Sequence, residues 1–165
     1  MQPTRTSLVF VVPVLVLAAG GAVISATTHD RGVERGRYLS IIGGCNDCHT
    51  PGYLEKSGAV PESLWLSGSP VGFQGPWGTT YPSNLRLVAA SMSEAQWLTH
   101  ARAARRPPMP WFNIRTMSDA DLSAIYEYLR SLGSGGEPAP AYAPPGEHVA
   151  TPYIDFVPKN LLPAG

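Results

Sequence analysis

The chain has 165 residues and no formal net charge. This length suits one ordinary domain, and the charge argues against nucleic acid as the main partner, because binding phosphates requires a marked basic excess. Glycine and proline, with 17 residues each, predict that much of the chain lies in turns and loops. Some other framework, such as a buried prosthetic group, would then organise those loops. Cys45 and Cys48 are the only two cysteines, which excludes a disulfide framework.

The N-terminus has the pattern of a targeting segment. Arg5 is the only charged residue in 1–26, residues 8–26 are mostly apolar, and small residues close the run. A short positive region, an apolar run and small residues together are typical of an export signal. The run is also long enough to cross a bilayer. Residues 1–26 are therefore predicted to be a signal peptide or an N-terminal membrane anchor, and in either case the remainder is exported.

The next part of the chain is expected to be one helix followed by a long loop region. Residues 31–44 are predicted to form a helix that leads into the cysteine pair. Gly32 and Gly36 lie one turn apart on it and would allow another backbone to approach closely. Residues 51–87 are dense in glycine and proline and are predicted to be mainly loop, with one short helical turn at 62–66.

Two later helices carry start and stop signals. Ser93 begins the first, because its side chain can cap the opening turn while Gln96 reaches back, and the prolines that follow stop it. Ser118 begins the second, and Gly133 ends it. Apolar residues on this second helix recur at the spacing of one buried face: Leu122, Ile125, Tyr126 and Leu129.

The C-terminal part is rich in proline and shows no helical periodicity, so residues 134–165 are predicted to be an extended tail. Its second half still carries apolar side chains that a freely solvated tail would not need: Tyr153, Ile154, Phe156, Leu161 and Leu162. We therefore expect part of the tail to lie across the surface of the domain or of a partner.

The chemistry of the sequence is concentrated in Cys45-Asn46-Asp47-Cys48-His49. Two thiols at this spacing add to the two vinyl groups of a haem, and the histidine that follows presents its imidazole to the iron. A redox-active dithiol usually follows a strand of an α/β fold, a pattern absent from this sequence. A zinc site needs further ligands, whereas His29, His100 and His148 are scattered singly. We therefore expect one covalently bound haem c with His49 as an axial ligand.

The second axial ligand is expected to be Met109. It lies in a proline-rich loop, residues 107–111, and prolines restrict the conformations of a loop that must hold a weak thioether donor. Thioether sulfur is a soft ligand that stabilises ferrous iron and raises the reduction potential. Methionine is more often ordinary core filler, and Met92, Met117 and His100 remain alternative ligands.

These features together resemble the monohaem cytochrome c family of bacteria, and their order resembles the cytochrome c domains that serve periplasmic dehydrogenases. The matching stretches are Gly36-Arg37-Tyr38-Leu39, Gly43-Gly44-Cys45-Asn46-Asp47-Cys48-His49-Thr50-Pro51, Pro108-Met109-Pro110-Trp111 and the helix at 119–130. The resemblance implies an all-α, cytochrome c-like fold with three to four helices around one haem. It divides the chain into the targeting segment at 1–26, a cytochrome c domain at 30–133 and the Pro-rich extended C-terminal tail at 134–165.

The resemblance also implies particular contacts. An opening helix would cross a closing helix, and the crossing would bring together Gly36, Tyr38, Tyr126 and Leu129. A hydrogen-bonding group that the sequence does not identify would orient the His49 ring.

A further segment, residues 75–84, offers hydrogen-bond donors near the expected haem. Haem propionates need such donors, so contact with at least one of three side chains is predicted: Trp77, Tyr81 and Asn84. The alternative is an aromatic-rich structural loop. Four arginines would offset propionate charge, dock an acidic partner or form a solvated basic face: Arg102, Arg105, Arg106 and Arg115.

The predicted function is electron transfer in the periplasm. Iron bound by both His49 and Met109 has no open position for a substrate, and the sequence shows no catalytic triad or carboxylate pair. The expected partners are a dehydrogenase donor and an oxidase or other cytochrome acceptor. The protein would be soluble after signal cleavage or tethered to the inner membrane through residues 8–26. Two alternatives are a cytochrome subunit held permanently in a dehydrogenase or oxidase complex, and a haem enzyme or gas sensor with an open sixth position.

Overall fold

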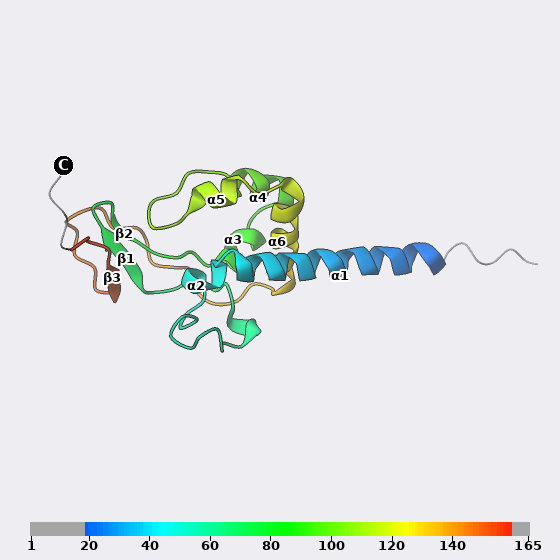
Figure 1. Cartoon of the computed structure of the whole chain (residues 1–165), viewed down its shortest axis with the longest axis horizontal. Helices are drawn as coiled ribbons and strands as arrows, with labels where there is room; N and C mark the ends of the chain where they lie inside the picture. Colours follow the sequence, from blue (N-terminus) through cyan, green and yellow to red (C-terminus); the bar gives the residue numbers. More distant parts are fainter. Residues whose placement is uncertain (1–18, 160–165) are drawn as a thin grey trace, which may run out of the picture.

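The structure is a computed structural model that describes residues 19–159. The predicted signal peptide or membrane anchor, residues 1–26, therefore lies mostly outside the described residues. Residues 19–26 form the start of helix α1 (Ala19–Ile42), which extends away from the other elements in Figure 1. Within residues 19–159, no helix combines the length and the apolar character needed to cross a membrane.

Helix α1 crosses helix α6 (Asp119–Ser131) and packs against it (Figure 1). The two helices approach closely because α1 has a glycine where they touch. A Cβ atom at Gly36 would lie 2.0 Å from the carbonyl oxygen of Ala124 and 2.8 Å from Cβ of Tyr128. The crossing of an opening and a closing helix, which the family resemblance implied, is therefore present.

The aromatic residues at this crossing differ from the expectation. Tyr38 is 51% exposed and does not pack into the core, whereas Tyr128 of α6 is only 2% exposed. The helical periodicity assigned that face to Tyr126, which is half-buried. Three residues of the predicted face are buried as expected: Leu122, Ile125 and Leu129.

A glycine turn redirects the chain from α1 into the short helix α2 (Cys45–His49). Gly44, directly before α2, has a φ of 67°, in the left-handed region that favours glycine. The helix predicted at residues 31–44 is thus correct in type, but it begins earlier in the chain and ends before the glycine pair.

The region predicted to be mainly loop contains a short 3-10 helix, η1 (Glu62–Leu64), and leads into a helix that was not predicted, α3 (Leu85–Ala90). Asn84 caps α3, because its Oδ1 accepts a hydrogen bond of 3.1 Å from the N–H of Leu87. Trp65 and Leu66, which follow η1, are buried in the core beneath the α1–α6 crossing.

The two later helices begin where their capping signals predict. Helix α4 (Glu94–Ala101) has the expected capping box: Ser93 Oγ accepts from the Gln96 N–H, and Gln96 Oε1 accepts from the Ser93 N–H at 2.8 Å. Ser118 Oγ likewise caps α6. A further short helix, α5 (Trp111–Arg115), lies between them.

Three short strands form a sheet in the order β2-β1-β3, which corrects the prediction of an all-α chain. Strands β1 (Gly72–Gly75) and β2 (Gly78–Thr80) form an antiparallel hairpin. Strand β3 (Tyr153–Asp155) comes from the tail and pairs with β1 in parallel. These strands are too short to show the alternation from which strands are predicted. Within 134–159 the tail has no helix, and it lies against the hairpin at the left of Figure 1.

Candidate functional site

Helix α2 carries both cysteines and the adjacent histidine. Cys45 and Cys48 lie one helical turn apart, are half-buried and are not joined by a disulfide. Burial raises the pKa of the Cys45 thiol to about 11 and also raises that of Cys48. A redox-active dithiol requires a lowered thiol pKa, so this environment disfavours that alternative. Among residues 19–159 no group of three or more His, Cys, Asp or Glu side chains is arranged to hold a metal ion.

His49 is held in one orientation. Its side chain is buried, with 7% exposed, and its Nδ1 lies 2.7 Å from the carbonyl oxygen of Ser83. A carbonyl only accepts hydrogen bonds, so Nδ1 carries the proton and Nε2 keeps a free lone pair. Burial lowers the pKa of His49, which keeps the ring neutral. A neutral imidazole fixed through one nitrogen and free at the other is the arrangement of a metal ligand.

Further hydrogen bonds brace the backbone of α2. Gly68 donates from its N–H to the carbonyl oxygen of His49 at 2.8 Å. Thr50 Oγ1 donates to Asn46 Oδ1 at 2.7 Å and accepts from the Leu66 N–H at 2.8 Å. The Nδ2 atom of Asn46 is buried without a hydrogen-bond partner among the described residues. These bonds connect the histidine directly to the segment that follows η1.

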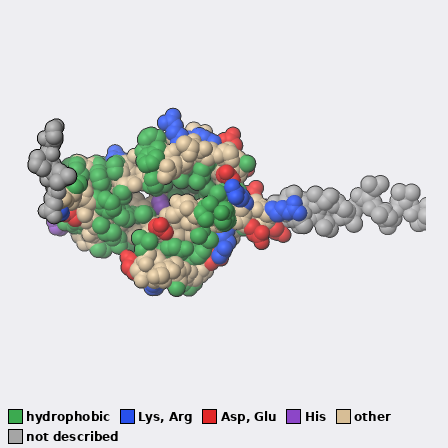
Figure 2. Space-filling model, viewed as in Figure 1, with side chains coloured by type: hydrophobic (Ala, Val, Ile, Leu, Met, Phe, Trp, Pro, Cys, Tyr) green, Lys and Arg blue, Asp and Glu red, His purple; other side chains and the backbone are tan. Residues whose placement is uncertain are grey.

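The face shown in Figure 2 contains a hollow between the part of the chain that holds α2 and the part that holds α4 and α5. Hydrophobic side chains edge this hollow, and a histidine side chain is visible inside it (Figure 2). The residues of this part of the structure therefore fit the predicted haem. Two thiols on one helix and a neutral imidazole held through Nδ1 are the donor set that a covalently attached haem requires, and the hollow with apolar edges is the kind of surroundings that it needs.

Met109 lies in the loop between α4 and α5, which borders the hollow on the side opposite α2 (Figures 1 and 2). Its side chain is half-buried. Two hydrogen bonds hold the loop near this residue. Thr80 Oγ1 donates to the Pro107 carbonyl oxygen at 2.9 Å, and the N–H of Trp111 donates to the Met109 carbonyl oxygen at 2.9 Å.

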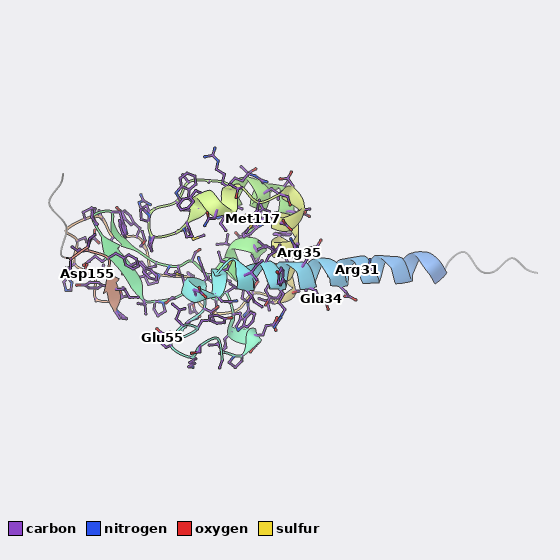
Figure 3. The ribbon with its side chains drawn as sticks, viewed as in Figure 1. Arg31, Glu34, Arg35, Glu55, Met117 and Asp155 are labelled. Carbon is purple, nitrogen blue, oxygen red and sulfur yellow. The ribbon has the colours of Figure 1, made fainter. Side chains whose placement is uncertain are left out.

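The alternative ligands have other surroundings. Met92 and Met117 both pack against the hydrophobic core. Met117, labelled in Figure 3, places its methyl carbon 3.8 Å from the position of a Cβ at Gly43. The ring of His100 stacks on Trp97, with 6.3 Å between the ring centroids. Met109 is not among the side chains packed on the core in the described part of the chain.

The three side chains predicted to contact propionates all contact the tail. The Tyr81 hydroxyl lies 2.5 Å from Thr151 Oγ1, and the Trp77 ring packs on Phe156, with centroids 6.2 Å apart. Asn84 uses both amide hydrogens on tail carbonyls, which leaves it no donor for a propionate. The structure thus gives Asn84 a different role. The indole N–H of Trp77 also has a partner, the carbonyl oxygen of Phe73 at 3.3 Å, and propionate contact by Trp77 or Tyr81 stays a prediction.

The four arginines of residues 102–115 contact four different partners. Arg102 pairs with Asp119, and Arg105 donates to the carbonyl oxygen of His100. The other two lie over aromatic rings, Arg106 over Tyr142 and Arg115 over Trp111.

The groups that orient the site were not predicted from the sequence. The partner of His49 is a backbone carbonyl, which every residue possesses, so no residue type marks Ser83. Arg86 was also missed. It is only 8% exposed, and its guanidinium donates to the carbonyl oxygens of Ser63, Leu132 and Gly133. The one sequence feature that could have identified Arg86 is its charge among the mostly apolar residues of α3.

Comparison with known proteins gives the same assignment. A family model described as cytochrome c matches residues 33–133, more than half of the chain. One of the subunits of nicotinate dehydrogenase from Pseudomonas putida is 30% identical over 120 residues, which cover 66% of this chain and 9% of that protein. The fructose dehydrogenase cytochrome subunit of Gluconobacter japonicus is 34% identical over 133 residues, 74% of this chain and 25% of that protein. The match thus spans a quarter or less of each relative, and no solved structure matches.

Proposed function

Because the chain belongs to the cytochrome c family, we propose that it is a periplasmic electron carrier with one covalently bound haem c, serving a dehydrogenase. Cys45 and Cys48 hold the haem, and His49 and Met109 are the axial ligands. The chain itself is a carrier and not an enzyme. The observation that carries this proposal is the fixed orientation of His49, whose Nδ1 is bound to the Ser83 carbonyl while Nε2 remains free.

The thiols and the imidazole have separate tasks. Cys45 and Cys48, one turn apart on α2, tether the group by two thioether bonds. His49 would hold the iron through Nε2, and the hydrogen bond at Nδ1 keeps the ring in the tautomer that leaves Nε2 free. When bound, the haem supplies an iron that takes up and releases a single electron.

Met109 is the proposed sixth ligand because, among the methionines of residues 19–159, it is the one that is not packed against the hydrophobic core. Met92 and Met117 fill space against the core, whereas Met109 lies half-buried in the loop beside the hollow. With both axial positions filled by side chains, no position is left for a substrate. Propionate contact by Trp77 or Tyr81 belongs to the same proposal.

The proposed partner is a dehydrogenase, with an oxidase or another cytochrome as the acceptor. Support comes from the names of the two relatives, one a subunit of a dehydrogenase and the other the cytochrome subunit of a dehydrogenase. The proposed location rests on residues 1–26, whose apolar run serves as an export signal or as a tether to the inner membrane. Export also suits covalent haem attachment, which takes place outside the cytosol.

The ligation is tested by recording the visible spectrum of the ferrous protein before and after carbon monoxide is added. We expect little change for the wild type and for Met117→Ala, and a rapid, complete shift for Met109→Ala. A shift in the wild type would indicate an open sixth position and favour a haem enzyme or gas sensor. A shift for Met117→Ala alone would assign the ligand to Met117.

The partner is tested by purifying the protein from its native membrane and periplasmic fractions. We expect a dehydrogenase to copurify, and the haem to become reduced when that enzyme's substrate is added. A haem that stays oxidised under these conditions would contradict the proposed electron donor.

A further inference from the structure

Residues 134–157 of the tail run along the segment that carries the histidine's partner, and we call them the strap. The strap contacts residues 72–84 at several points. Thr79 and Ala143 exchange two backbone hydrogen bonds, of 2.8 and 3.1 Å. Tyr142 donates from its hydroxyl to the Trp77 carbonyl oxygen at 2.9 Å. Strand β3 then pairs with β1, so the strap holds this segment along most of its length.

One contact with the strap is made by Asn84, the residue that directly follows Ser83. Asn84 is 3% exposed, and its Nδ2 donates to the carbonyl oxygens of Gly135 at 2.8 Å and Glu137 at 3.2 Å. Its Oδ1 simultaneously caps α3 through the Leu87 N–H. The Asn84 side chain thus ties the strap to the position next to Ser83, whose backbone carbonyl binds the histidine.

Glycines allow the strap to come this close. A Cβ at Gly136, whose φ is +77°, would lie 3.1 Å from Nδ2 of Asn84 and 3.1 Å from Cβ of Ser67. A Cβ at Gly135 would lie 2.8 Å from a guanidinium nitrogen of Arg86. The paired glycines, which have no evident role in an extended tail, are therefore explained by contact with Asn84 and Arg86.

We propose that the strap, acting through Asn84, positions the Ser83 carbonyl against His49 and so tunes the electron donation of this ligand to the iron. The proposal rests on the proposed function. It makes Asn84 a positioning residue, and it gives a role to a segment outside the part of the chain that matches the family, residues 33–133.

The expected direction follows from the hydrogen bond. A strong bond from Nδ1–H to a carbonyl makes the imidazole a better electron donor, which stabilises ferric iron and lowers the reduction potential. Loosening the strap lengthens this bond. The reduction potential should then rise, and the Nδ1 proton should exchange faster with solvent.

Gly136→Ala tests this in the haem-loaded full-length protein, with Gly146→Ala as the matched control. Both glycines lie in the strap with positive φ, 77° and 85°, but a Cβ at Gly146 would meet nothing within 4 Å. The readouts are the reduction potential and the exchange rate of the His49 Nδ1 proton, followed by NMR in the ferrous protein. For Gly136→Ala we expect a higher potential and exchange about two- to tenfold faster, the range for losing one hydrogen bond. Gly146→Ala should match the wild type.

A second variant acts from the other side of the contact. Asn84→Ser keeps a side-chain oxygen to cap α3 but loses the amide that binds the strap, so it should reproduce both changes. Equal effects of Gly136→Ala and Gly146→Ala would overturn the inference, because backbone strain alone would explain them. Unchanged readouts in a haem-bearing protein would overturn the strap's role and leave the proposed function intact. A wild type without covalent haem would overturn both.

Discussion

The two sides of the hollow are built differently. On the histidine side, backbone and side-chain hydrogen bonds connect α2 to the residues after η1, and the Ser83 carbonyl fixes the His49 ring. On the methionine side, Met109 lies in an irregular loop that Thr80 ties to the hairpin by a single side-chain bond to Pro107. One proposed ligand is braced by several segments of the chain, and the other is held by a loop.

This difference indicates that the two proposed ligands have different functions. A ligand held by a connected hydrogen-bond network keeps its geometry when a neighbour is lost, whereas a ligand on a lightly held loop moves readily. The histidine side should therefore decide whether haem is bound at all. The methionine side should decide whether an external molecule can reach the iron.

The largest expected effect comes from exchanging each ligand for alanine in turn. His49→Ala removes the braced ligand, and the yield of haem-bearing protein should fall by at least about tenfold, since even outer partners of metal ligands are worth that much. Met109→Ala should keep its covalent haem. Intact mass and haem staining, normalised to total protein, measure both. Equal losses in the two variants would remove the asymmetry between the sides.

Arg86 is a buried side chain on the histidine side of the hollow. Replacing it should have the next largest effect, a loss of stability. Its guanidinium binds three backbone carbonyls, among them those that close α6. Arg86→Met leaves these carbonyls without partners, and the free energy of unfolding should fall by about 3 kcal/mol. Urea denaturation of the haem-bearing protein measures it. Arg31→Met, at an exposed position of α1, is the control and should change stability little.

Helices α1 and α6 pack closely where they cross. Two glycines of α1 allow the effect of this packing on stability to be distinguished from the effect of helix propensity. A Cβ at Gly36 meets the backbone of Ala124, so Gly36→Ala should lower the free energy of unfolding by about 1–3 kcal/mol. A Cβ at Gly32 meets the carboxylate end of the Glu127 side chain, which can move, so Gly32→Ala should be neutral or stabilising. Thermal unfolding compares the pair. A stability loss at Gly32 equal to that at Gly36 would contradict the close backbone contact as the cause.

The parts of the fold that follow local rules could be predicted from the sequence. The capping residues Ser93 and Ser118 located the starts of α4 and α6. Haem attachment at Cys45 and Cys48, which the cysteine motif indicates, stays a prediction. The sheet could not be predicted, because β1 acquires its partner β3 from the far end of the chain. Helix α3 was missed because its cap, Asn84, follows a stretch of glycines and prolines that predicts only loop.

The residues of the candidate site also fall into those that the sequence indicates and those that it does not. His49 is visible in the sequence because its position beside Cys48 is part of the motif. The Ser83 carbonyl that orients it is not visible, since a backbone group has no signature in the choice of residue. Asn84 was selected as a hydrogen-bond donor, but its partners, Gly135 and Glu137, are distant in sequence and become neighbours only in the folded chain. Ligation by Met109 stays a prediction.

The smallest expected effect lies on the methionine side and tests how lightly the loop is held. Thr80→Val keeps the branched shape that suits a strand but removes the hydroxyl that binds the Pro107 carbonyl. One such bond contributes about 0.5–1.5 kcal/mol, so the affinity of the ferric protein for added imidazole should rise about two- to tenfold while stability changes little. Thr99→Val, which removes a hydroxyl bound to Ala95 within α4, is the control. Unchanged imidazole affinity in Thr80→Val would mean that Met109 is held by its bond to iron and the packing of its own loop, and the two sides would then differ less than their hydrogen bonds suggest.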